Sequence, residues 1–82
     1  MTVSCGDGGF CFSSEWAVEL EGQGAKLSNG TVRDAGQGVR FDGVGSHFIW
    51  KITATDNCEN IYVDPGSNNN HLWWVVTQNS LL

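Results

Sequence analysis

The strongest constraint on the fold is a set of short apolar segments in which every second residue is apolar. Between Phe10 and Leu20 the large apolar side chains share one parity, and a second such segment runs from His47 to Thr55. A period of two places one face of a strand in a core and the other in water. A helix over residues 14–20 is the alternative, but it would point Val18 away from the other apolar residues. Glycine, 11 of the 82 residues, also disfavours helix.

Turn residues divide the rest of the chain into further short strands. Asn29-Gly30 lies between two short polar-apolar runs and predicts a β-hairpin with a type I′ turn. With Thr31 the same pair forms a glycosylation sequon, which matters only in a secreted chain. Short strands are also expected at 39–42, 61–63 and 72–77. About five to six strands at intervals of roughly ten residues, with no internal repeat, predict a small antiparallel sandwich or barrel.

The length and charge of the chain limit its organisation and partners. We expect a flexible arm at 1–9, a single β-sandwich domain at 10–78 and a C-terminal tail at 79–82. The formal net charge is −5 and the few cations are scattered, so a nucleic-acid partner is not expected. No apolar run approaches the roughly 18 residues of a membrane span. The first residues lack the basic and apolar segments of a signal peptide, so such a peptide is either unused or already removed.

The three cysteines indicate a disulfide rather than a metal site. Cys5, Cys11 and Cys58 have no zinc-site spacing, even when His47 and His71 are added. One disulfide and one spare thiol are therefore expected. A Cys11–Cys58 bridge would enclose about 47 residues and stabilise the fold by roughly 4 kcal/mol. Cys11 begins a patterned strand, but Cys5 is an alternative partner for Cys58. Dependence on such a bridge suits a secreted protein.

No motif of a known enzyme class is present, and we expect a protein that is not an enzyme and has no cofactor or metal. Neither G-x-S-x-G nor H-E-x-x-H occurs. Glu15 and Glu19 share an outward strand face, as on any solvated strand. The candidate acids and bases are Glu15, Glu19, Asp42, Asp56, Asp64, His47 and His71.

Adjacent tryptophans predict a binding surface near the C-terminus. Trp73 and Trp74 in one strand should point to opposite faces, so at most one can lie in the core. An exposed tryptophan is a typical interface anchor. Trp16, with Val18 and Leu20, and Trp50, with Phe48 and Ile52, are expected in the core instead.

Two kinds of partner fit that surface. A protein could add a strand to an open sheet edge, with the acidic side chains steering a basic partner; the same acids could simply keep the chain soluble. The residues predicted for protein binding are Trp73, Trp74, Glu15, Glu19 and Asp64. Alternatively, Asn68-Asn69-Asn70-His71 could hydrogen-bond a sugar that stacks on Trp73, as in a small lectin-like carbohydrate-binding module.

The order of these features resembles the MAX effectors, the ToxB-like avirulence proteins that plant-pathogenic fungi secrete. The resemblance covers about residues 10–78 and rests on Phe10-Cys11-Phe12, the strand at 46–54 and Thr55-Asp56-Asn57-Cys58 directly after it. It implies a six-stranded antiparallel β-sandwich of two three-stranded sheets with a Cys11–Cys58 disulfide. It also implies a secreted, monomeric virulence or avirulence factor. Such a factor enters the host plant cell and binds a host protein, such as a heavy-metal-associated domain or an immune receptor.

Overall fold

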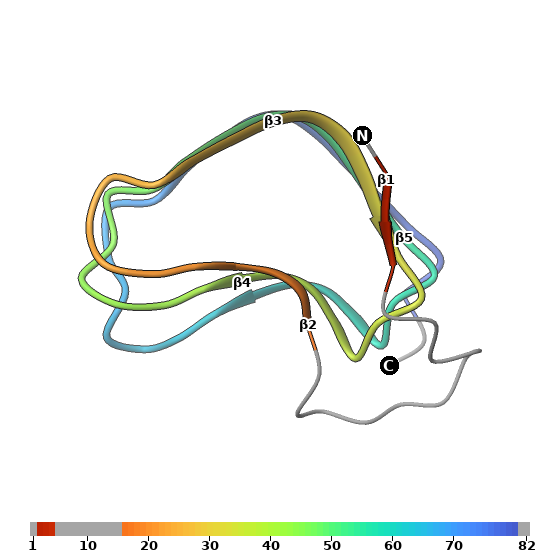
Figure 1. Cartoon of the computed structure of the whole chain (residues 1–82), viewed down its shortest axis with the longest axis horizontal. Coiled ribbons are helices and arrows are strands. Elements are labelled where there is room, and N and C mark those ends of the chain that lie inside the picture. The colour runs from red at the N-terminus through yellow and green to blue at the C-terminus, as the bar shows by residue number, and fades with distance from the viewer. Residues whose placement is uncertain (1, 5–15, 81–82) are drawn as a thin grey trace.

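The chain forms two β-sheets in a computed structural model that describes residues 2–4 and 16–80 (Figure 1). The strands alternate between the two sheets along the chain. Sheet A has the order β1 (Thr2–Ser4), β3 (Lys26–Arg33), β5 (Phe48–Thr55) and β7 (His71–Gln78). Sheet B has the order β2 (Trp16–Leu20), β4 (Gln37–Phe41) and β6 (Glu59–Val63). The described residues include no helix long and apolar enough to cross a membrane. The predicted all-β class is confirmed.

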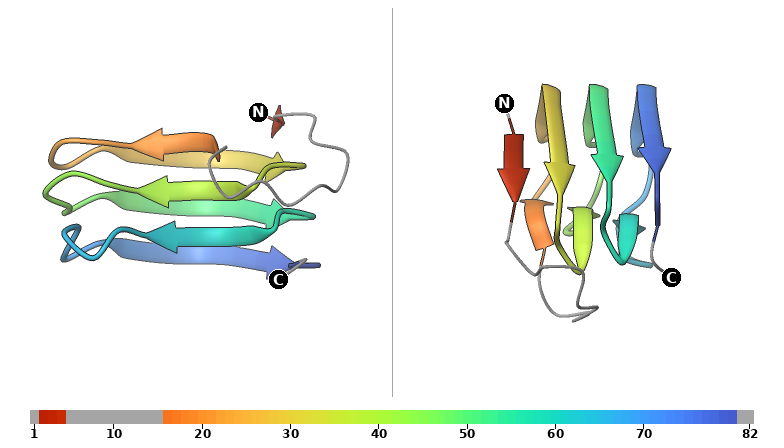
Figure 2. Two further views of the ribbon diagram at one scale, coloured as in Figure 1. Left: turned by 90° about the horizontal axis from the view of Figure 1, so that it is seen from below. Right: turned by 90° about the vertical axis from the view of Figure 1, so that its right-hand side faces the viewer.

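Every strand pair is parallel, so the chain winds as a parallel β-solenoid. The Ala25 N–H donates to His47, 22 residues ahead, and the His47 N–H donates to Asn70, 23 residues ahead. The strand register likewise gives 21 to 23 residues for one coil, and Figure 2 shows the coils stacked on one another. The predicted antiparallel sandwich of two three-stranded sheets is wrong, because sheet A has four strands and all neighbours run in the same direction. The repeat was missed because it lies in the backbone path rather than in residue identity.

Sheet A bends at three stacked residues with left-handed backbone. Asn29, Lys51 and Trp74 have φ values of 59°, 55° and 55°, and the strand register places them side by side on successive coils. Figure 1 shows the resulting bend in sheet A. The predicted hairpin at Asn29-Gly30 is wrong: both residues lie inside β3, and a parallel neighbour cannot be reached through a two-residue turn.

The left-handed residue also shifts the alternation within each strand. In β5 the buried residues are Ile49, Ile52 and Ala54, so the spacing is three residues across Lys51 and two residues after it. Phe48 consequently points outward, as does Trp50, and neither belongs to the core as expected. The buried core between the sheets consists of Leu20, Val32, Val39, Phe41, Ile49, Ile52 and Ala54.

The stack is tightest at its middle coil and more open beside the last one. Val39 and Phe41 in β4 are fully buried, because β2 and β6 cover them on both sides. Val63 in β6 and Leu72 in β7 occupy inward positions yet are 45% and 46% exposed. In the described sheets β6 pairs with β4 alone and β7 pairs with β5 alone, so the last coil is uncovered on its outer side. Trp16, expected in the core, is 38% exposed on sheet B.

Buried polar side chains tie the coils together at the turns. The Asn57 Oδ1 accepts from the Ala35 N–H at 3.1 Å, and its Nδ2 donates to the Val32 carbonyl at 3.2 Å and to the Asn60 Oδ1 at 2.9 Å. The Asn60 Nδ2 then donates to the Gln78 carbonyl at 3.0 Å. These bonds link three successive coils and satisfy the buried amides.

His47 has the same structural role at another turn. Its Nδ1 accepts from the Ala25 N–H at 3.0 Å, so its Nε2–H donates to the Asp42 carbonyl at 2.8 Å. The imidazole is fully buried. His47, a candidate acid or base from the sequence, therefore has both ring nitrogens engaged in holding backbone.

Candidate functional site

The outward side chains of sheet A form a surface of rings that we call the aromatic face. Its members are Phe48, Trp50, His71, Trp73 and Trp74. The ring centroid of Phe48 lies 5.1 Å from that of Trp50 and 6.1 Å from that of His71. The strand register places Trp73 beside Trp50 on the next coil, so the rings continue across β5 and β7. The aromatic face thus spans two coils.

Both neighbouring tryptophans of β7 are exposed, which corrects the expectation that they point to opposite faces. The exposed fractions of Trp73 and Trp74 are 62% and 65%, and their ring centroids are 6.4 Å apart. Alternation holds only for extended backbone, and Trp74 has the left-handed φ described above. The Lys51 Nζ lies 5.4 Å from the centroid of the Trp74 ring, in a cation–π contact that orients the indole.

An open pocket of about 360 Å³ adjoins these rings. It is lined by Lys26, Ser46, Phe48, Trp50 and His71. Lys26, Phe48 and His71 are register partners on three successive coils, so the coil stack itself assembles the lining. The pocket combines two ring surfaces with an ammonium, a hydroxyl and an imidazole. This composition matches small-ligand sites, which are mainly apolar with a few placed polar groups.

In the run Asn68-Asn69-Asn70, which is predicted to bind sugar, two of the side chains form hydrogen bonds that stabilise a turn instead. The Asn68 Nδ2 donates to the Gly66 carbonyl at 3.3 Å. The Asn70 Nδ2 donates to the Ser67 hydroxyl at 3.1 Å, and its Oδ1 accepts from the His47 N–H. Of this predicted group, His71 alone lines the pocket.

A second polar and aromatic cluster lies on the outer face of sheet B, centred on Arg40. The guanidinium lies 5.1 Å from the Trp16 ring centroid and 4.9 Å from that of Tyr62. Its Nε is 3.5 Å from a Glu19 oxygen and 3.2 Å from an Asp42 oxygen. Burial alone would lower the pKa of Arg40, but Asp42 raises it above its ordinary value. Arg40 therefore stays charged between two rings and two carboxyl groups.

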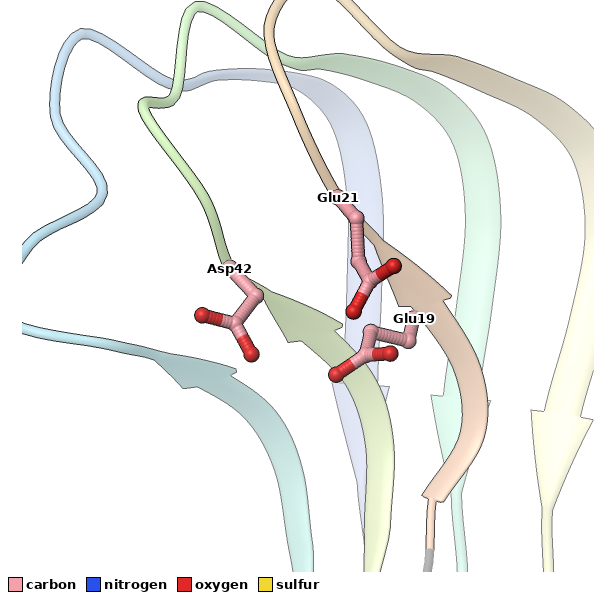
Figure 3. A group of neighbouring side chains, drawn as sticks. All are labelled: Glu19, Glu21 and Asp42. Carbon is pink, nitrogen blue, oxygen red and sulfur yellow. The ribbon is translucent and has the colours of Figure 1, made fainter.

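Three carboxyl groups meet beside this arginine. Glu19, Glu21 and Asp42 each offer an oxygen within 4.8 Å of the others, and Figure 3 shows the groups converging. Burial, then a hydrogen bond from the protonated Glu19 carboxyl to Glu21 and the negative charge of Glu21, raise the pKa of Glu19 to about 7. The pKa of Asp42 is lowered, first by the Gly43 N–H and then by Arg40. Such oxygens suit a hard cation, but here Arg40 supplies positive charge at the same place.

The residues predicted for protein binding are not brought together. Trp73 and Trp74 lie on sheet A, whereas Glu19 belongs to sheet B. Asp64 directly follows β6, in the position that Asp42 has after β4. Glu15 lies outside the described residues.

Of the two cysteines in the predicted disulfide, only Cys58 belongs to the described residues. Cys58 is buried, and Cys11 lies outside the described residues. The pocket residues Lys26, Ser46 and Phe48 were missed, because only the coil register brings them together.

Comparison with protein-family models, curated proteins and solved structures gives no match to this chain.

Proposed function

We propose that the chain is a non-enzymatic carbohydrate-binding module whose ligand lies on the aromatic face. The observation that carries this proposal is the continuity of the exposed Trp73 and Trp74 rings with the pocket at Phe48 and Trp50. The C–H face of a sugar ring packs on an indole, while its hydroxyls need donors and acceptors beside that ring. Lys26, Ser46 and His71 supply such groups.

The solenoid favours an extended glycan over a single sugar. Outward residues of β3, β5 and β7 stand in rows that cross the coils at a spacing of about 4.8 Å. Parallel hydrogen bonding and the buried amides of Asn57 and Asn60 fix these rows. A rigid row of rings and polar groups can bind successive sugar units with little further loss of side-chain conformational entropy.

The test is glycan binding by the full chain and by ring-deletion variants. Trp73→Ala and Trp74→Ala should each weaken binding by at least about fivefold, or about 1 kcal/mol, in calorimetric titration with a ligand found on a glycan array. Trp16→Ala is the matched control, because it removes an exposed indole from sheet B. Melting curves check that each variant folds. Equal affinities for all three variants would reject the aromatic face as the site.

A protein partner is a second candidate, favoured by the edge of sheet A. In the described part of the chain β7 pairs with β5 alone, so one side of an eight-residue strand is open to strand addition. The exposed inward residues Val63 and Leu72 would be covered by such a partner. Binding should slow amide hydrogen exchange along β7, and unchanged exchange there would exclude this mode.

The effector role, with secretion, entry into a plant cell and a host-protein target, is a proposal on the resemblance alone. That resemblance implies antiparallel sheets, whereas the described sheets are parallel. A Cys11–Cys58 disulfide and secretion are also proposed, on the cysteine usage. A secreted module that binds extracellular glycan would unite these features without a host-cell target.

A further inference from the structure

Charge is distributed unequally between the two sheets. The strands β3, β5 and β7 contain no Asp or Glu, although the whole chain has a formal net charge of −5. Three of the four Lys and Arg residues, Lys26, Arg33 and Lys51, lie in β3 and β5. Glu19, Asp42 and their acidic neighbours gather on sheet B instead. The potential at sheet A is therefore more positive than the net charge suggests.

Two of these cations lie directly at the aromatic face. Lys26 lines the pocket and is the register partner of Phe48. Lys51 follows Trp50 and lies over the Trp74 ring. Within residues 2–4 and 16–80, the salt bridges involve Arg33 and Arg40 and neither lysine. The ammonium groups of Lys26 and Lys51 thus have no carboxylate partner there and can pair with a ligand.

Arg33 differs from the two lysines in this respect. It lies at the last position of β3, and its Nε is 3.1 Å from the Asp34 carboxylate. Its charge is therefore already compensated at the strand end away from the pocket residues. This makes Arg33 a control for charge removal from the same sheet.

We infer that the aromatic face binds an anionic glycan, whose carboxylates pair with Lys26 and Lys51 while its sugar rings pack on the tryptophans. This inference rests on the proposed carbohydrate-binding function and adds the class of ligand. Neutral glycans could accept hydrogen bonds from the two ammonium groups but could not form ion pairs with them. Sheet B, with its clustered carboxylates, would repel the same ligand and so restrict it to sheet A.

The experiment compares uronate oligosaccharides with their methyl esters, which have the same chain length and no charge. Oligogalacturonate and oligomannuronate are titrated into the full chain, each in its acid and ester form. The acid form should bind at least about tenfold more tightly at low salt, and this advantage should shrink as salt rises from about 50 to about 300 mM. The double variant Lys26→Gln, Lys51→Gln should lower affinity for the acid form to that for the ester.

The controls separate the inference from the function on which it rests. Arg33→Gln should change affinity for the acid form by less than about twofold, because this guanidinium is already paired. Equal affinities for the acid and the ester would overturn the inference of an anionic ligand, while the proposed carbohydrate-binding function would stand. Loss of acid binding in Arg33→Gln as large as in the lysine variant would also overturn it. Binding of neither form, nor of any glycan on an array, would overturn both.

Discussion

Lys51 and Trp74 occupy the same place on neighbouring coils and have the same left-handed backbone, each with a φ of 55°. The Lys51 ammonium lies over the Trp74 ring, with the Nζ 5.4 Å from the ring centroid. Neither residue type favours positive φ, since its Cβ crowds the following carbonyl. The position therefore stores backbone strain, and the stacked register of sheet A maintains it.

A glycine substitution should be tolerated at Lys51 but should destabilise the fold at Thr53. Left-handed backbone costs an L-residue about 1–2 kcal/mol, and glycine avoids this cost. The gain offsets the entropic penalty that glycine otherwise brings to a strand. Lys51→Gly should therefore leave stability within about 0.5 kcal/mol of the wild type, whereas Thr53→Gly in the same strand should lose about 1 kcal/mol. Urea unfolding measures both. Equal losses would contradict the strain at Lys51.

Gly38 should not accept even one methyl group. A Cβ there would lie 2.5 Å from the Asn60 backbone oxygen and 2.7 Å from the Asn57 Nδ2. Gly38→Ala should therefore cost about 1–3 kcal/mol of unfolding free energy. Gly66→Ala is the matched control, because a Cβ at Gly66 meets no atom within 4 Å. Similar melting temperatures for the two variants would show that the coils are not packed this closely.

Stability should decrease as pH rises through neutrality. The pKa of Glu19 is raised from 4.5 to about 7, so between these values the folded chain holds a proton that the unfolded chain releases. The contribution is fully present below pH 4.5 and is lost as pH rises through 7. Thermal melts from about pH 5 to about pH 8 should show this decline.

Two variants isolate the Glu19 contribution from other titrating groups. Glu19→Gln keeps a neutral side chain at every pH, so the decline should flatten and the variant should melt above the wild type at high pH. Glu59→Gln removes the same charge elsewhere on sheet B and should keep the wild-type slope. A wild-type slope in Glu19→Gln would contradict the role of Glu19.

A disulfide between Cys11 and Cys58 should stabilise the fold substantially. The closed loop predicts roughly 4 kcal/mol, so reduction should lower the melting temperature sharply. Mass spectrometry of an unreduced digest should identify a peptide that joins these two cysteines. A link from Cys5 to Cys58, or three free thiols, would contradict the pairing.

Strand content could be predicted from the sequence, but strand direction could not. The alternating segments near Trp16–Leu20 and Phe48–Thr55 are strands, as expected. Alternation is the same in parallel and antiparallel sheets, however, and the pair Asn29-Gly30 favours a hairpin turn on sequence grounds. Its left-handed asparagine is used instead to bend a continuous strand. Lys51 and Trp74 occupy the same bend without any local sequence signal.

The candidate site was predictable only in part. The exposure of one indole followed from the adjacent Trp73 and Trp74, but the exposure of both required the backbone angle at Trp74. Lys26 is 45 residues from His71, and only the coil period places them around one pocket. The structural role of His47 likewise depends on a carbonyl and an amide from neighbouring turns.

The separation of inward from outward positions lets this architecture change ligands without refolding. His71, Trp73 and Trp74 face outward on β7, while the turn bonds of Asn57, Asn60 and His47 set the coil length. The outward side chains of one coil can therefore change during evolution, and the ligand specificity of the surface with them, while the fold is kept. A single-residue deletion inside β5, in contrast, would exchange the inward and outward positions of the residues that follow it in the strand.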